Sequence, residues 1–177
     1  MIRSWCNKPI KKLATKSAAG YLPELVGNGS GERARRLAAR TWEFSDFLVN
    51  ELDCADLKSP FEGVVAYHDS CHGLRELGIG EQPRQLLRGV AGVELREIED
   101  DSRCCGFGGL FSTGYPELSA ALGRDKIEAI RRTGASWVVS TDVSCLMQMD
   151  GLLRREGASD VKTLHLAQLL DPEGGAC

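Results

Sequence analysis

Short apolar runs alternate with longer stretches of helical periodicity along most of the chain. Four short runs predict β-strands. They cover residues 63–68, 93–98, 136–140 and 162–165. The first is a continuous apolar run, as in a strand buried on both faces, whereas the second alternates apolar with charged residues. The pattern therefore predicts a small sheet of four strands.

Helical periodicity fills most of the intervals between these strands. It predicts helices over 32–52, 82–88 and 116–134, another that begins near 141–145 and ends near 156, and a short one after 165. Pro at the start and Gly at the end of 116–134 are typical helix boundaries. Its expected inner face consists of Leu118, Ala121, Leu122, Ala129 and Ile130. Strands that alternate with helices indicate an α/β fold, which we expect to be three-layered around a mainly parallel sheet.

A cluster of cysteines and glycines follows the second predicted strand. Cys104 and Cys105 are adjacent, and Gly106, Gly108 and Gly109 come directly after them. Neighbouring thiols can reach one inorganic cluster if the backbone turns sharply around it, and glycine permits that turn because it adopts positive φ freely. Successive backbone N–H groups in such a turn form a nest for an anionic metal–sulfur site. We therefore interpret this loop as part of an iron–sulfur site.

Cysteine also follows two other predicted strands, at Cys71 and Cys145. The carboxyl ends of parallel strands lie at one edge of a sheet, so we expect Cys71, Cys104, Cys105 and Cys145 to meet there. Four thiolates suit tetrahedral zinc or an iron–sulfur cluster. Zinc sites usually use paired CxxC motifs, which this chain lacks. The adjacent cysteines therefore favour an iron–sulfur cluster, with zinc as the alternative.

Two histidines flank the first cysteine. His68 and His72 could each donate a hydrogen bond to a cluster sulfur or transfer a proton. In the alternative interpretation, His68 ends the strand and His72 is a solvated loop residue. A third histidine, His165, is expected to be structural. The sequence contains no paired carboxylates, nucleophile–base pattern or phosphate-binding loop, and it identifies no catalytic residue.

Composition changes this picture little. The 177 residues are 42% hydrophobic and 27% charged, which is typical of one soluble domain. A net charge of −3 gives no reason to expect nucleic acid as a partner. No apolar run approaches the roughly 20 residues of a transmembrane helix, and no secretory signal is visible. We therefore expect the seven cysteines to be reduced, in a cytoplasmic protein.

The two ends of the chain differ from the rest. Residues 1–20 carry five basic residues and no acidic one, so we interpret them as a basic N-terminal segment that is poorly ordered, with an organelle transit peptide as the alternative. Residues 21–171 form the expected cysteine-rich domain, and 172–177 a frayed tail. The remaining cysteines, Cys6, Cys54 and Cys177, are not expected to be ligands.

The cysteine spacing resembles that of the cysteine-rich CCG-domain family of iron–sulfur oxidoreductases. Thirty-two residues separate Cys71 from Cys104, and 39 separate Cys105 from Cys145. The strings Tyr-His-Asp-Ser-Cys-His at 67–72, Cys-Cys-Gly-Phe-Gly-Gly at 104–109 and Ser-Cys at 144–145 are most similar to members that serve in lactate utilization. The family also includes the iron–sulfur subunit of glycolate oxidase and the CCG-containing subunit of heterodisulfide reductase.

The resemblance implies a function for the whole chain. It implies an electron-transfer subunit of a complex that oxidises a 2-hydroxy acid, L-lactate to pyruvate, with the four cysteines holding a [4Fe–4S] cluster. The expected partners are the other subunits of a lactate or glycolate oxidation complex, including a ferredoxin-type iron–sulfur protein. A glycolate-oxidase-type or heterodisulfide-reductase-type subunit is one alternative. A non-redox domain with structural zinc at the same cysteines is another.

Two features differ from the family pattern. Gln148 stands where heterodisulfide reductase has the last cysteine of a CxxC motif, which favours a simpler four-thiolate cluster. Family members usually carry two CCG motifs in tandem, whereas this chain has one, which resembles the second. A truncated copy that binds no cluster is therefore a third interpretation.

Overall fold

The computed structural model of the chain describes residues 36–54, 57–99 and 103–171. The predicted basic segment 1–20 and tail 172–177 lie outside the described residues, and so do Cys6, Cys177 and the first residues of the helix predicted over 32–52.

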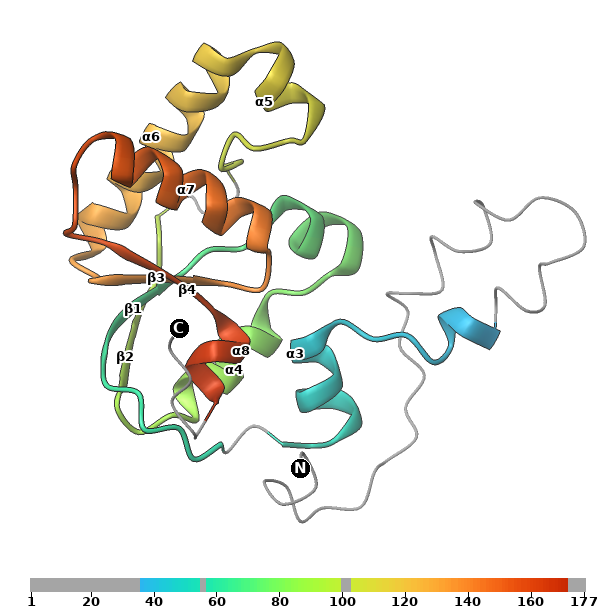
Figure 1. The fold of residues 1–177 in the computed structure, drawn as a ribbon. Helices are drawn as coiled ribbons and strands as arrows, with labels where there is room; N and C mark the ends of the chain where they lie inside the picture. The colour runs from blue at the N-terminus through green and yellow to red at the C-terminus, as the bar shows by residue number, and fades with distance from the viewer. Residues whose placement is uncertain (1–35, 55–56, 100–102, 172–177) are drawn as a thin grey trace, which may run out of the picture.

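The described chain forms one four-stranded sheet. Its strands are β1 (Gly63–Tyr67), β2 (Val93–Arg96), β3 (Trp137–Ser140) and β4 (Lys162–His165). They lie in the order β2-β1-β3-β4, and every neighbouring pair is parallel (Figure 1). All four strands were predicted from the sequence, each to within two residues at its ends.

Helices cover both faces of this sheet, which confirms the three-layer α/β fold. On one face lie α6 (Pro116–Thr133) and α7 (Val143–Arg155) (Figure 1). On the other lie α4 (Glu81–Arg88), α8 (Leu166–Leu170) and the segment formed by α3 (Phe44–Asp46) and the π-helical η2 (Phe47–Glu51).

Strand β1 contributes side chains to two hydrophobic cores, one on each face of the sheet. Val65, Ala66 and Tyr67 are all at most 1% exposed. Since side chains alternate along a strand, Ala66 packs in the core beneath α6 and α7, whereas Val65 and Tyr67 pack in the core beneath α4 and α8. The continuous apolar run therefore marks a strand buried on both faces, as predicted.

The ends of α6 and α7 follow from local chemistry. Pro116 occupies the first turn of α6, and Gly134 ends the helix in the left-handed conformation with φ of 71°. The carboxylate of Asp142 accepts hydrogen bonds from the backbone N–H groups of Ser144 and Cys145, and so caps α7. Both helices match their predicted positions closely.

The helix predicted over 32–52 is interrupted, and this prediction was wrong in that respect. Residues 41–43 are not helical, and a new helix begins after Glu43. The Glu43 carboxylate accepts hydrogen bonds from the backbone N–H groups of Ser45 and Asp46, which allows the chain to start α3 there.

The predicted inner face of α6 was partly wrong. Leu118 is 53% exposed and Ala121 is exposed, whereas Ser119, Gly123 and Lys126 are buried. The loop that carries Cys104 and Cys105 packs against α6 near its first turns, and only small side chains leave room for that backbone. Lys126 is 2% exposed although its residue type gives no expectation of burial.

Two helical segments were not predicted. The π-helical η3 (His72–Leu77) follows Cys71, and the short α5 (Leu110–Gly114) follows the glycine-rich loop. In the part of the chain that the structure describes, none of the helices combines the length and the apolar character needed to span a lipid bilayer.

Candidate metal centre

The strand order creates a natural binding position at the carboxyl ends of β1 and β3. These strands are neighbours, but the chain leaves them in opposite directions along the sheet, β1 toward β2 and β3 toward β4. The helices that follow them, α4 and α7, cover opposite faces. The point between the two connections is a topological switch point, the position at which open parallel sheets commonly bind ligands.

Each predicted cysteine lies beyond the carboxyl end of β1, β2 or β3, close to this switch point. Cys71 follows β1 and directly precedes η3. Cys104 and Cys105 lie in the connection between β2 and α5, and Cys145 lies in the first turn of α7 after β3. Segments far apart in sequence thus bring four thiols to one end of the sheet.

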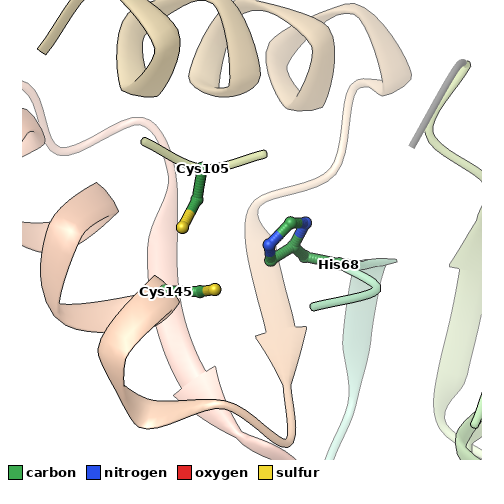
Figure 2. Close-up of side chains that lie close together, drawn as sticks. All are labelled: His68, Cys105 and Cys145. Carbon is green, nitrogen blue, oxygen red and sulfur yellow. The ribbon is translucent and has the colours of Figure 1, made fainter. Parts of the chain in front are cut away.

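His68, Cys105 and Cys145 form a compact buried group. Their relative exposures are 0%, 2% and 4%. A ring nitrogen of His68 and the two Sγ atoms lie within 4.8 Å of one another, and Figure 2 shows the three side chains pointing toward a common centre. Two thiolates and an imidazole are donors that suit zinc or iron.

Cys71 and Cys104 form the outer half of the site. Both side chains are half-buried, and their thiols are in hydrogen-bonding contact. The structure therefore places all four predicted cysteines together, as an inner pair and an outer pair. Cys54, by contrast, is buried in the core beneath α4 and α8, as expected for a small apolar residue.

The inner cysteines share one proton. A hydrogen bond from the Cys145 thiol lowers the pKa of Cys105 to about 4; burial opposes this shift, and His68 and the backbone of Phe107 reinforce it. The same hydrogen bond, together with burial, raises the pKa of Cys145. In the metal-free protein this hydrogen bond favours a thiolate at Cys105 and a thiol at Cys145. Thiolate is the form that binds metal, so metal binding would release the proton that the pair retains. Burial raises the pKa of the outer thiol of Cys104.

The glycines shape the loop as a turn around the thiols. Gly106, Gly108 and Gly109 all have positive φ, at 87°, 53° and 56°. The backbone N–H of Gly106 donates to Sγ of Cys104 over 3.3 Å. A Cβ atom on Gly106 would lie 2.3 Å from the carbonyl oxygen of Ser119, so this position needs glycine for space as well as for conformation.

The other two histidines lie outside the buried group. His72 is exposed at the start of η3. Nδ1 of His165 accepts a hydrogen bond from the backbone N–H of Ala167, so its Nε2 carries the proton and donates to the carbonyl oxygen of Thr141 over 3.1 Å. His165 thus caps α8 and has the structural role that was predicted.

Sequence reasoning missed the side chains that hold the cysteine loops. Ser119 Oγ donates to the carbonyl oxygen of Gly106 over 2.7 Å, and Nε2 of Gln148 donates to Ser119 Oγ over 3.0 Å. Gln148, noted only for the cysteine it replaces, therefore supports the double-cysteine loop. On the other side, Arg84 binds Asp69, which stands next to His68. Neither contact has a local sequence signal, because its partners come from different elements.

The donor set fits a thiolate-bound metal or iron–sulfur cluster. Four thiols and one imidazole converge, two thiols already share a proton, and backbone N–H groups face sulfur. Hydrogen bonds to sulfur are typical of iron–sulfur sites, where they adjust the reduction potential.

Comparisons with known proteins identify the same cysteine-rich region of the chain. Residues 65–150 match the cysteine-rich domain family CCG. The chain is 42% identical over 182 residues to lactate utilization protein A of Oceanobacillus iheyensis, which covers 99% of this chain and 74% of that protein. It is 38% identical over 139 residues to lactate utilization protein A of Lysinibacillus sphaericus, with coverage of 78% and 60%.

A third relative has no functional name. The chain is 37% identical over 157 residues to the uncharacterized protein YkgE of Escherichia coli, with coverage of 89% of this chain and 64% of that protein. The matches thus span between 60% and 74% of the length of these three relatives. The chain belongs to the lactate utilization protein A family, and residues 65–150 carry its CCG cysteine-rich domain.

Proposed function

We propose that Cys71, Cys104, Cys105 and Cys145 hold an iron–sulfur cluster, of the [4Fe–4S] type, that relays electrons during oxidation of a 2-hydroxy acid, L-lactate to pyruvate. The observation that carries this proposal is the convergence of the four thiols at the carboxyl ends of the strands. The names of the relatives support lactate as the 2-hydroxy acid.

The burial of the site supports electron transfer. A bound cluster would supply reversible one-electron chemistry. On its inner side, His68, Cys105 and Cys145 are buried and exclude water. On its outer side, Cys71 and Cys104 are only half-buried, so electrons would enter and leave past them. Hydrogen bonds to sulfur from the backbone of Gly106 and from His68 would stabilise the more reduced, more negative state.

A single zinc ion is the second candidate. It is favoured by one observation, the close approach of the His68 nitrogen to the Sγ atoms of Cys105 and Cys145, all within 4.8 Å. Three such ligand atoms can bind one ion, with an outer cysteine as the fourth ligand. In that case the domain would be structural and would carry no electrons.

We propose that the protein acts in the cytoplasm with other subunits of a lactate or glycolate oxidation complex, among them a ferredoxin-type iron–sulfur protein. Gln148 supports a four-thiolate site of the lactate type over the heterodisulfide-reductase type, because its side chain binds Ser119. Each of the three relatives has a further segment outside the region that matches this chain. A polypeptide that corresponds to that segment is a further candidate partner.

Metal analysis tests the proposal. The protein is purified without oxygen, and iron, zinc and acid-labile sulfide are measured together with the visible spectrum. We expect iron and sulfide in similar amounts and a brown absorbance that bleaches on reduction. In Cys105→Ser the iron should be lost while the far-UV circular dichroism stays that of an α/β fold.

The matched control is Cys54→Ser, which changes a buried cysteine outside the site. It should keep its iron. Zinc near one equivalent without sulfide would establish the structural alternative, and a Cys105→Ser variant with unchanged iron would refute the ligand assignment.

A further inference from the structure

The geometry points to Arg84 as a positioning residue that fixes the Cys71 loop through Asp69. Arg84 lies on α4, on the opposite face of the sheet from the helix that carries Cys145. Its role at the cluster rests on the proposed function, whereas its role in holding Cys71 can be tested without any metal.

The guanidinium of Arg84 makes three sets of hydrogen bonds. It donates to both carboxylate oxygens of Asp69, over 2.9 and 2.7 Å. It also donates to the carbonyl oxygen of Gly80 over 2.7 Å. Its Nε donates to the carboxylate of Glu97 over 2.9 and 3.1 Å. This use of several guanidinium donors requires the planar, forked geometry of arginine.

These contacts join the two ends of one segment. Asp69 precedes Cys71 by two residues, and Gly80 follows η3, the π-helix that begins directly after Cys71. One side chain therefore holds both ends of the segment 69–80 that presents the Cys71 thiol. Glu97, the third partner, lies just beyond β2 on the connection that leads to Cys104. Arg84 thus links the segments of both outer cysteines.

The burial of the pair makes the clamp specific. The side chain of Asp69 is 7% exposed and that of Arg84 is 14% exposed. The guanidinium also lies over the ring of Tyr67, 5.2 Å from its centroid. The buried Asp69 carboxylate is stabilised by the paired guanidinium, so loss of Arg84 would destabilise Asp69 in this position and loosen the Cys71 loop that follows it.

A second bidentate arginine–aspartate pair lies far from the cysteines and is more exposed, with side-chain exposures of 31% and 50%. Arg131 binds both carboxylate oxygens of Asp160, over 2.7 and 3.2 Å. Arg131 is in the last turn of α6, and Asp160 precedes β4, so this pair is at the amino ends of the strands. It provides a matched control in which an arginine–aspartate pair is removed at the other end of the sheet.

The experiment measures how fast each cysteine reacts with an alkylating reagent. Reduced, metal-free protein is treated with iodoacetamide, and mass spectrometry resolves the rate at each residue. In Arg84→Met we expect Cys71 to react several-fold faster than in the wild type, with Cys145 unchanged. In Arg131→Met both rates should stay at wild-type values. An unchanged Cys71 rate in Arg84→Met would overturn the proposal.

A conservative variant covers the case in which Arg84→Met does not fold. Arg84→Lys keeps the charge but lacks the planar fork, and its three donors cannot replace the five hydrogen bonds that Arg84 makes to Asp69, Gly80 and Glu97. We expect it to melt like the wild type and still to accelerate alkylation of Cys71. Wild-type alkylation in a folded Arg84→Lys protein would show that charge alone suffices, which also overturns the positioning role.

Iron release separates this inference from the proposed function. In iron-loaded protein, Arg84→Lys should lose iron to a chelator about tenfold faster, the effect of removing a partner that orients a metal ligand. Wild-type protein that binds no iron would refute the cluster but not the Cys71 result. Normal iron content together with unchanged Cys71 alkylation and unchanged iron release would refute the role of Arg84 alone.

Discussion

At the scale of single residues, the site is defined by thiols with unequal environments. Cys105 and Cys145 are buried together with His68, whereas Cys71 and Cys104 are half-buried. The hydrogen bond between the inner cysteines lowers the pKa of Cys105 and raises the pKa of Cys145. This difference has a measurable effect on the metal-free protein.

The first prediction concerns the pH dependence of stability. The pKa of Cys105 is about 4 in the folded protein and 9.0 ordinarily, so the unfolded chain binds one more proton between these values. The free energy of unfolding should therefore rise with pH from about 4 to 9 through Cys105. Above 9 the order reverses, because folded Cys145 keeps its proton, and stability should fall.

Urea unfolding of reduced, metal-free protein across this pH range measures the effect. The comparison is with Cys105→Ser, which removes the thiolate and its hydrogen bond, so the difference between the two proteins should grow from acid toward pH 9. A difference that is constant with pH would contradict the shared proton.

At the scale of elements, α6 is the platform for the double-cysteine loop. Ser119 and Gly123 are small and buried, and the loop backbone approaches them closely at Gly106 and Cys105. Gln148 of α7 completes the contact through Ser119. The loop that carries two of the four thiols is thus held by two helices that also form the core.

The second prediction tests this contact with two glycine variants. Gly106→Ala should lower the free energy of unfolding by roughly 2–4 kcal/mol, since its Cβ would meet the Ser119 carbonyl at 2.3 Å and its φ is positive. Gly109→Ala, also with positive φ but with nothing within 4 Å, should cost only about 1–2 kcal/mol.

Chemical denaturation of the metal-free proteins gives both values. Only Gly106→Ala should also reduce the iron content after reconstitution, because only there does the loop have to leave α6. Equal losses in the two variants would mean that backbone conformation alone determines the effect.

At the scale of the whole molecule, the sheet joins two cores and one site. The core beneath α6 and α7 and the core beneath α4 and α8 meet across strands that are buried on both faces. The thiols lie where the chain leaves the sheet toward these two layers. The site therefore depends on both cores at once.

The third prediction is that the two cores unfold together. Ile130→Ala in one core and Leu86→Ala in the other should each cost about 2–5 kcal/mol, because both side chains are fully buried. Thermal unfolding followed by far-UV circular dichroism and by tryptophan fluorescence should give coincident transitions in both variants. Separate transitions in either variant would show that each layer is stable without the other.

Much of the fold could be predicted from local pattern. Strand positions, the boundaries of α6 and α7, and the edge of the sheet where the cysteines meet all followed from periodicity, capping residues and the parallel topology. The break before α3 could not be predicted, because Glu43 caps the new helix by a side-chain contact that periodicity does not register. The true inner face of α6 was hidden for a similar reason, since Ser119 and Gly123 face both the double-cysteine loop and α7.

The sequence by itself determined the strands, the layers and the identity of the four thiols, because these depend on residue type and on spacing along the chain. Only the tertiary structure decided that the thiols divide into an inner and an outer pair, that His68 joins the inner pair, and that Arg84 and Gln148 support the loops. Those relations join residues far apart in sequence. They arise from the strand order and the close packing of helices, which leave no trace in any single stretch of the chain.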